Sequence, residues 1–209
     1  MKTILFQGDS ITDCCRVRDA AANTPGHLGY GYVNLISSEL LGTRPEEMYR
    51  CINKGISGNR VVDLYARWKI DALNFSPDVI SILIGVNDVW HEVGNQNGVE
   101  ADRFEQVYRM LLEWTKKVLP EVKLLIMEPF ALISDVVDEA FMADVKVRAE
   151  IAEKLAAEFG AVYLPLQNML NEATRLAPNS YWLADGVHPS PAGNKLIADA
   201  WLKAAADLL

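Results

Sequence analysis

Short apolar segments rich in Ile, Leu and Val recur along the 209-residue chain and are separated by longer stretches with helical periodicity. Most of these segments lack the polar–apolar alternation of a half-exposed strand, which is typical of strands buried on both faces of a parallel sheet. The predicted strands are Thr3–Gln7, Met48–Ile52, Val79–Ile84, Val122–Met127 and Ala161–Leu164. We therefore expect an α/β fold, a three-layer α/β/α sandwich around a central five-stranded parallel sheet.

Helical stripes of apolar residues fill most of the intervals between these strands. The predicted helices cover Tyr32–Leu41, Val61–Leu73, Phe104–Thr115, Phe141–Phe159 and a last segment that carries Ile197, Ala200, Trp201, Ala204 and Leu208. Gly160 is well placed to end the fourth helix, and Ser190-Pro191 is a cap followed by proline at the first position of the last helix. Because no repeat or linker divides the chain, we expect a single domain over residues 1–209.

Acidic residues outnumber basic ones, 28 to 20, which gives a net charge of −8. An acidic surface disfavours nucleic acid or a membrane as partner and favours a small-molecule or oligosaccharide substrate. The N-terminal apolar run is too short for a signal peptide, no stretch could span a bilayer, and Cys14, Cys15 and Cys51 do not resemble a disulfide framework. These features predict a cytoplasmic protein, although a chain whose export signal had been removed would look the same. A homo-oligomer is compatible with the sequence.

Polar or flexible residues follow the first three predicted strands. Ser10 comes after the first strand, Gly58 after the second and Asn87 after the third. Because ligands bind beyond the carboxyl ends of parallel strands, we expect these residues to share one edge of the sheet. A serine can act as a nucleophile, and glycine N–H and asparagine amide groups can stabilise an oxyanion. The structural alternatives are a helix cap at Ser10, a turn at Gly58 and a helix cap at Asn87.

The candidate imidazole bases for such a serine are the three histidines, His27, His91 and His188. Only His188 has a carboxylate three residues earlier, Asp185, in a turn that contains glycine. Imidazole titrates near neutrality, which suits a general base. Asp185 is therefore predicted to accept the Nδ1 proton of His188, with Asp9 or Asp13 as alternative partners.

Three aromatic residues, Trp90, Trp182 and Tyr30, are candidates for stacking on a sugar ring, although aromatic side chains more often belong to the core. The metal-binding patterns His-x-His, His-Glu-x-x-His and Cys-x-x-Cys are absent, so no metal site is predicted. The glycines near residue 26 do not form a phosphate-binding loop. The chemistry outlined above requires no cofactor.

Gly8-Asp9-Ser10, Gly58, Asn87 and Asp185-x-x-His188 together resemble the Ser, Gly, Asn and His blocks of the SGNH (GDSL-type) hydrolases. The resemblance extends over almost the whole chain and implies a flavodoxin-like sandwich that hydrolyses carboxylic esters. It also implies the site roles. Ser10 would be the nucleophile and an oxyanion donor, Gly58 and Asn87 would be further oxyanion donors, and His188 with Asp185 would be the base pair.

Within that family, several stretches resemble intracellular acetylxylan esterases, namely Gly8–Cys14, Asn53–Asn59, Ala66-Arg67-Trp68 and Asn87–Trp90. This similarity implies removal of O-acetyl groups from xylo-oligosaccharides or related sugars. One alternative is a lipase, lysophospholipase or thioesterase that uses the same site. Another is a flavodoxin-like binding protein without catalysis.

Overall fold

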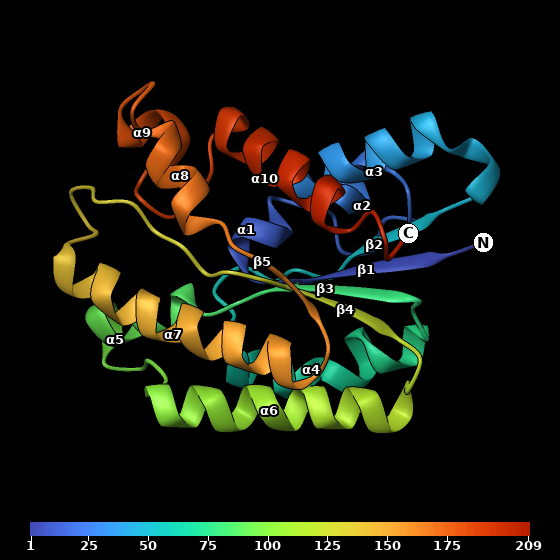
Figure 1. The fold of residues 1–209 in the computed structure, drawn as a ribbon, viewed down its shortest axis with the longest axis horizontal. Helices are drawn as coiled ribbons and strands as arrows, with labels where there is room; N and C mark the ends of the chain where they lie inside the picture. The colour runs from blue at the N-terminus through green and yellow to red at the C-terminus, as the bar shows by residue number, and fades with distance from the viewer.

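Five parallel strands form the centre of the computed structural model, which describes residues 1–209 (Figure 1). The strands are β1 (Thr3–Gly8), β2 (Arg50–Asn53), β3 (Val79–Leu83), β4 (Lys123–Met127) and β5 (Val162–Leu164). Their order across the sheet is β2-β1-β3-β4-β5, the doubly wound order of flavodoxin-like folds. The predicted fold class is confirmed, and every predicted strand begins and ends within two residues of an observed one.

Helices cover both faces of the sheet (Figure 1). One layer contains α3 (Tyr32–Thr43) and α10 (Pro191–Ala204), together with the shorter α1 (Ser10–Asp13), α2 (Pro25–Leu28), α8 (Gln167–Ala173) and α9 (Asn179–Trp182). The other layer contains α4 (Val61–Asp71), α5 (Val86–Asn95), α6 (Ala101–Val118) and α7 (Glu139–Glu158). Two 3₁₀ turns cover Pro45–Glu47 and Leu73–Phe75. None of the helices has both the length and the apolar character needed to cross a membrane.

Each helix layer places one fully buried tryptophan against a face of the sheet. Trp201 of α10 and Trp68 of α4 are both fully buried. A buried indole N–H needs an acceptor, and each finds a hydroxyl. Trp201 Nε1 donates to Ser81 Oγ at 2.9 Å, and Trp68 Nε1 donates to Thr115 Oγ1 at 2.8 Å. The strands are therefore covered by buried side chains on both faces of the sheet, as their unbroken apolar segments predict.

Neither Ser10 nor Asn87 is a helix cap, the structural alternative that the sequence offered for each of them. Asp9, not Ser10, is the N-cap of α1, and its carboxylate accepts a hydrogen bond from the Ile11 N–H at 3.0 Å. Gly85 is the N-cap of α5, so Asn87 lies inside that helix. Capping therefore does not occupy the side chain of Ser10 or of Asn87.

The segment around His27, which lies between Gly26 and Gly29, forms the helical turn α2. Thr24 caps it by accepting the His27 N–H, and Pro25 occupies its first position. Apolar periodicity does not reveal this helix, because it has only four residues, with Gly26 inside it and Gly29 at its end. His27 is 5% exposed, and its Nε2 accepts the Asn53 N–H at 3.2 Å. His27 thus ties α2 to β2.

The two predicted helix boundaries are confirmed. Ser190 caps α10 by accepting the Gly193 N–H, with Pro191 as the first helical residue. The helix α7 ends at Glu158, and Gly160 follows with a φ of 64°. A left-handed residue at this place is a common way to end a helix.

The segment after β2 packs backbone to backbone against α1. A Cβ atom on Gly55 would lie 2.3 Å from Asp13 N and 2.7 Å from the Thr12 carbonyl carbon. Both atoms belong to the main chain, so neither can move without shifting α1. Only glycine fits at this crossing, and the crossing fixes the Gly58 turn relative to Ser10.

We predict that Gly55→Ala lowers the free energy of unfolding by about 2 kcal/mol or more, because the added methyl group overpacks two backbone segments. Gly42→Ala in α3 is the matched control, since a methyl group there meets nothing within 4 Å. The control should leave stability unchanged or raise it by up to about 1 kcal/mol. Urea denaturation measures both, and wild-type stability of Gly55→Ala would contradict the close approach.

Candidate active site

Ser10 and His188 meet at the carboxyl edge of the sheet although 178 residues separate them in the sequence. Ser10 opens α1 directly after β1, and His188 lies in the loop that leads into α10. The distance from Ser10 Oγ to His188 Nε2 is 2.8 Å. An antiparallel bridge between Leu183 and Pro189 closes the loop that carries the histidine. The hydroxyl can therefore donate its proton to the imidazole without any movement of the chain.

Asp185 holds the other side of the imidazole. Its Oδ2 lies 2.7 Å from His188 Nδ1, while its Oδ1 accepts the N–H groups of Val187 and His188 at 3.0 and 2.8 Å. Burial works against ionisation of this carboxyl, but the hydrogen bonds outweigh it and hold the pKa of Asp185 below its ordinary value. A carboxylate at Nδ1 keeps the proton on that nitrogen and leaves Nε2 free to accept one from Ser10.

The two alternative carboxylates bind backbone groups instead of the imidazole. Asp9 Oδ1 accepts the Ile11 N–H. Asp13 Oδ1 accepts the Arg16 N–H at 3.2 Å, and its Oδ2 accepts the Ser57 N–H at 3.0 Å. Asp185 is thus the carboxylate that contacts His188, and Asp13 instead anchors the segment after β2 to α1.

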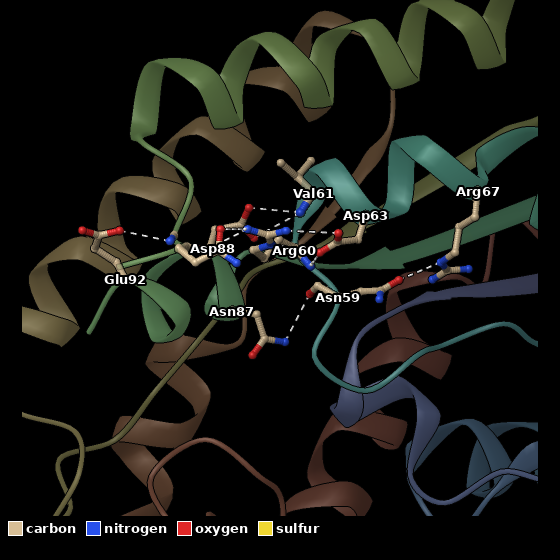
Figure 2. A network of polar contacts seen from close by, with 10 residues as sticks. Asn59, Arg60, Val61, Asp63, Arg67, Asn87, Asp88 and Glu92 are labelled. Atoms are coloured by element: carbon tan, nitrogen blue, oxygen red, sulfur yellow. Dashed lines mark hydrogen bonds and ion pairs between the residues drawn. The ribbon is translucent and has the colours of Figure 1, made fainter. Parts of the chain in front are cut away.

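Gly58 and Asn87 lie together beside the end of β1. The Ile56 N–H donates to Gly8 O at 3.1 Å, which attaches the Gly58 turn to that strand. One N–H of the Asn87 amide donates to Asn59 O at 3.2 Å, as Figure 2 shows. The second N–H of this amide and the N–H of Gly58 have no acceptor within the protein. Gly58 also turns the chain, with a φ of 82°.

Arg67 is a positioning residue that the sequence argument did not single out as part of the site. Its Nε donates to Asn59 Oδ1 at 2.7 Å (Figure 2), and a terminal nitrogen donates to Gly8 O at 3.2 Å. It also forms an ion pair with Asp71 one helical turn later, at 3.2 Å. Arg67 therefore fastens the Gly58 turn to the strand that precedes Ser10. The only sequence signal for it was its place in one of the stretches that carry the family resemblance.

The three candidate stacking residues occupy different surroundings. Trp90 is half-buried, and its ring lies edge-on to the His188 ring at a centroid distance of 6.5 Å. The indole N–H of Trp182 donates to Ala177 O at 3.2 Å, within its own surface turn. Tyr30 is 79% exposed. The structure brings Trp90 to the Ser10–His188 pair, and it records no contact of Trp182 or Tyr30 with that pair.

Two fully buried carboxyl groups lie next in sequence to site residues. Asp9 precedes Ser10, and Asp88 follows Asn87. Both oxygens of Asp88 accept the Val61 N–H, at 3.0 and 3.3 Å (Figure 2), whereas Asp9 Oδ2 has no partner. Burial, the largest influence, raises the pKa of each group to about 7. Both carboxyl groups therefore favour the neutral form more strongly in the folded chain than in the unfolded one.

We predict that the free energy of unfolding of Asp9→Asn rises relative to that of the wild type as the pH rises. The folded chain binds the Asp9 proton more tightly than the unfolded chain, so the resulting stabilisation is full below pH 4 and is lost as the pH rises through about 7. Asparagine does not titrate, so the gap in unfolding free energy should grow between pH 5 and pH 8, by up to about 3 kcal/mol.

Asp19→Asn, at an exposed carboxylate, controls for the loss of one charge. Denaturant titrations at the two pH values measure both variants. A gap for Asp9→Asn that stays constant, or that shrinks at pH 8, would contradict the raised pKa.

Comparison with known proteins gives a consistent picture. The model of the GDSL-like lipase/acylhydrolase family matches residues 6–196. An acetylxylan esterase of Geobacillus stearothermophilus is 36% identical over 204 residues, which cover 96% of this chain and 92% of that protein.

Solved structures agree with these matches over the full length of the fold. A Parabacteroides merdae protein described as a GDSL-like lipase superposes with a TM-score of 0.95 at 40% identity, over 100% of this chain and 96% of that one. An acetylxylan esterase from Geobacillus stearothermophilus superposes with a TM-score of 0.89 at 34% identity, over 97% and 93% of the two chains. The chain therefore belongs to the GDSL-like lipase/acylhydrolase family of serine ester hydrolases.

Proposed function

We propose that the protein removes O-acetyl groups from xylo-oligosaccharides or related sugars, with Ser10 as nucleophile and His188 and Asp185 as its base pair. The observation that carries this proposal is the hydrogen-bonded chain from Asp185 through His188 to Ser10, with distances of 2.7 and 2.8 Å. Nucleophile, base and orienting acid stand in the order that acyl transfer needs. The acetylxylan esterases among the similar proteins support the acetyl-sugar substrate.

The reaction proceeds in two half-reactions. His188 Nε2 takes the hydroxyl proton of Ser10 while Oγ forms a bond to the ester carbonyl carbon. The tetrahedral intermediate collapses as the imidazolium returns this proton to the departing sugar oxygen, which leaves an acetylated Ser10. The same imidazole then deprotonates a water molecule that attacks the acetyl group. As the bond between the acetyl carbon and Ser10 Oγ breaks, the imidazolium returns the proton to Oγ, which releases acetic acid and free Ser10. Asp185 stabilises the imidazolium in both halves.

Three N–H groups are suited to hold the negative charge of the intermediate. They are the backbone N–H groups of Ser10 and Gly58 and the second amide N–H of Asn87. The Gly58 N–H and the second amide N–H of Asn87 have no acceptor within the protein, which supports this role. Donors fixed in advance lower the barrier because they need no reorganisation when charge develops on the oxygen.

Variants of the Geobacillus esterase support the same assignment. Those described as catalytic mutants replace a serine, an aspartate and a histidine by alanine. The aspartate and the histidine are three residues apart in that enzyme, which is also the spacing of Asp185 and His188.

We expect acetate release from acetylated xylo-oligosaccharides at a higher kcat/KM than from esters with longer acyl chains, and Ser10→Ala should abolish it. Ser10→Ala loses the nucleophile but keeps the fold, which circular dichroism checks. A preference for long acyl chains would favour a lipase or thioesterase instead. Undiminished turnover by Ser10→Ala would exclude Ser10 as the nucleophile.

Asn87→Ala should lower kcat for p-nitrophenyl acetate by roughly 10²–10³-fold, the usual effect of losing one oxyanion donor. Asn95→Ala, at the exposed end of the same helix, is the matched control and should keep the wild-type kcat. Steady-state kinetics at saturating substrate separates kcat from KM. A loss below about five-fold would remove Asn87 from the oxyanion site, because such an effect is too small for a lost donor.

A further inference from the structure

The helix α5 carries more of the site than Asn87 alone. His91 lies four residues after Asn87, and residues spaced by four share one face of a helix. Trp90, which precedes His91, borders the His188 ring. His91 therefore lies on the part of α5 that faces the catalytic groups.

The space next to Gly58 is open, and His91 forms its nearest wall. A methyl group built on Gly58 would lie 3.9 Å from His91 Nε2, and no other atom outside its chain neighbours would come within 4 Å. The imidazole thus stands over the turn that supplies one of the proposed oxyanion donors. A substrate bound to that donor has His91 beside it.

The ring of His91 is free to bind a ligand. It is half-buried, and neither ring nitrogen has a hydrogen-bond partner in the protein, in contrast to both nitrogens of His188. The nearby Asp63 does not hold it, because that carboxylate accepts the backbone N–H and the Nε of Arg60, each at 2.9 Å (Figure 2). A neutral imidazole offers one donor and one acceptor, as a sugar hydroxyl does.

We infer that His91 is a specificity residue that forms a hydrogen bond with a hydroxyl of the sugar next to the scissile ester. This inference rests on the proposed acetyl-sugar activity. Trp90 borders the imidazole that protonates the departing sugar oxygen, whereas His91 borders the Gly58 turn. The two neighbouring residues of α5 therefore border different parts of the site, Trp90 the His188 ring and His91 the Gly58 turn.

The test compares kcat/KM for acetylated xylobiose with kcat/KM for p-nitrophenyl acetate, which has no sugar hydroxyl. In His91→Ala the sugar-to-nitrophenyl ratio should fall about three- to ten-fold, mainly through KM, as for the loss of one neutral hydrogen bond. His91→Gln keeps a donor and an acceptor and should recover part of this ratio. Val93→Ala, on the same helix and 72% exposed, is the control and should keep the wild-type ratio.

The outcomes separate this inference from the proposed function. An unchanged ratio in His91→Ala, or an equal loss on both substrates, overturns the role of His91 while leaving the acetyl-sugar activity in place. A wild-type enzyme that hydrolyses p-nitrophenyl acetate but no acetylated sugar overturns both. If thermal unfolding shows that His91→Ala is misfolded, His91→Gln and His91→Phe decide, since only glutamine should retain part of the ratio.

Discussion

Burial of the parallel sheet on both faces decides where this protein can carry out chemistry. Every residue of β1 is buried, and helix layers cover both faces of the sheet. Polar side chains are costly in such an interior unless they are paired, so reactive groups are confined to the ends of the strands. The loops after β1, β2 and β3 leave the sheet at one edge, and this edge collects the serine, the glycine turn and the asparagine.

One close backbone crossing and several side-chain hydrogen bonds hold these loops in position. Gly55 crosses α1 at a distance that admits no side chain, and Asp13 accepts a hydrogen bond from Ser57 in the same segment. Arg67 adds a bridge from that segment to Gly8. The proposed oxyanion donors therefore belong to a frame that is fixed before substrate arrives. Such preorganisation is a large part of how an enzyme stabilises charge.

Much of this could be predicted from the sequence. The strands were recognisable because burial on both faces requires unbroken apolar segments, which leave a clear pattern. Asp185 was recognisable as the partner of His188 because a separation of three residues in a turn brings the two side chains together. Ser10, Gly58 and Asn87 could be placed at one edge because parallel strands end on the same side.

The remaining features depend on contacts that no local pattern encodes. Arg67 acts through a backbone carbonyl of a distant strand, and any polar helix surface could carry an arginine without such a bond. The helix α2 was hidden by its glycines, and the cap of α1 by the serine that follows Asp9. The position of His91 over Gly58 depends on how α5 lies against the loop after β2. Only the three-dimensional structure reveals that arrangement.

The contact between Ser10 and His188 joins the first strand to the loop before the last helix. Because Ser10 precedes His188 by 178 residues, the serine is synthesised long before the imidazole that it contacts in the folded protein. Nascent chains that do not yet contain His188 therefore carry Ser10 without its hydrogen-bond partner. Long-range contacts of this kind are also slow to form, so the meeting of Ser10 and His188 marks a late event in the folding of each molecule.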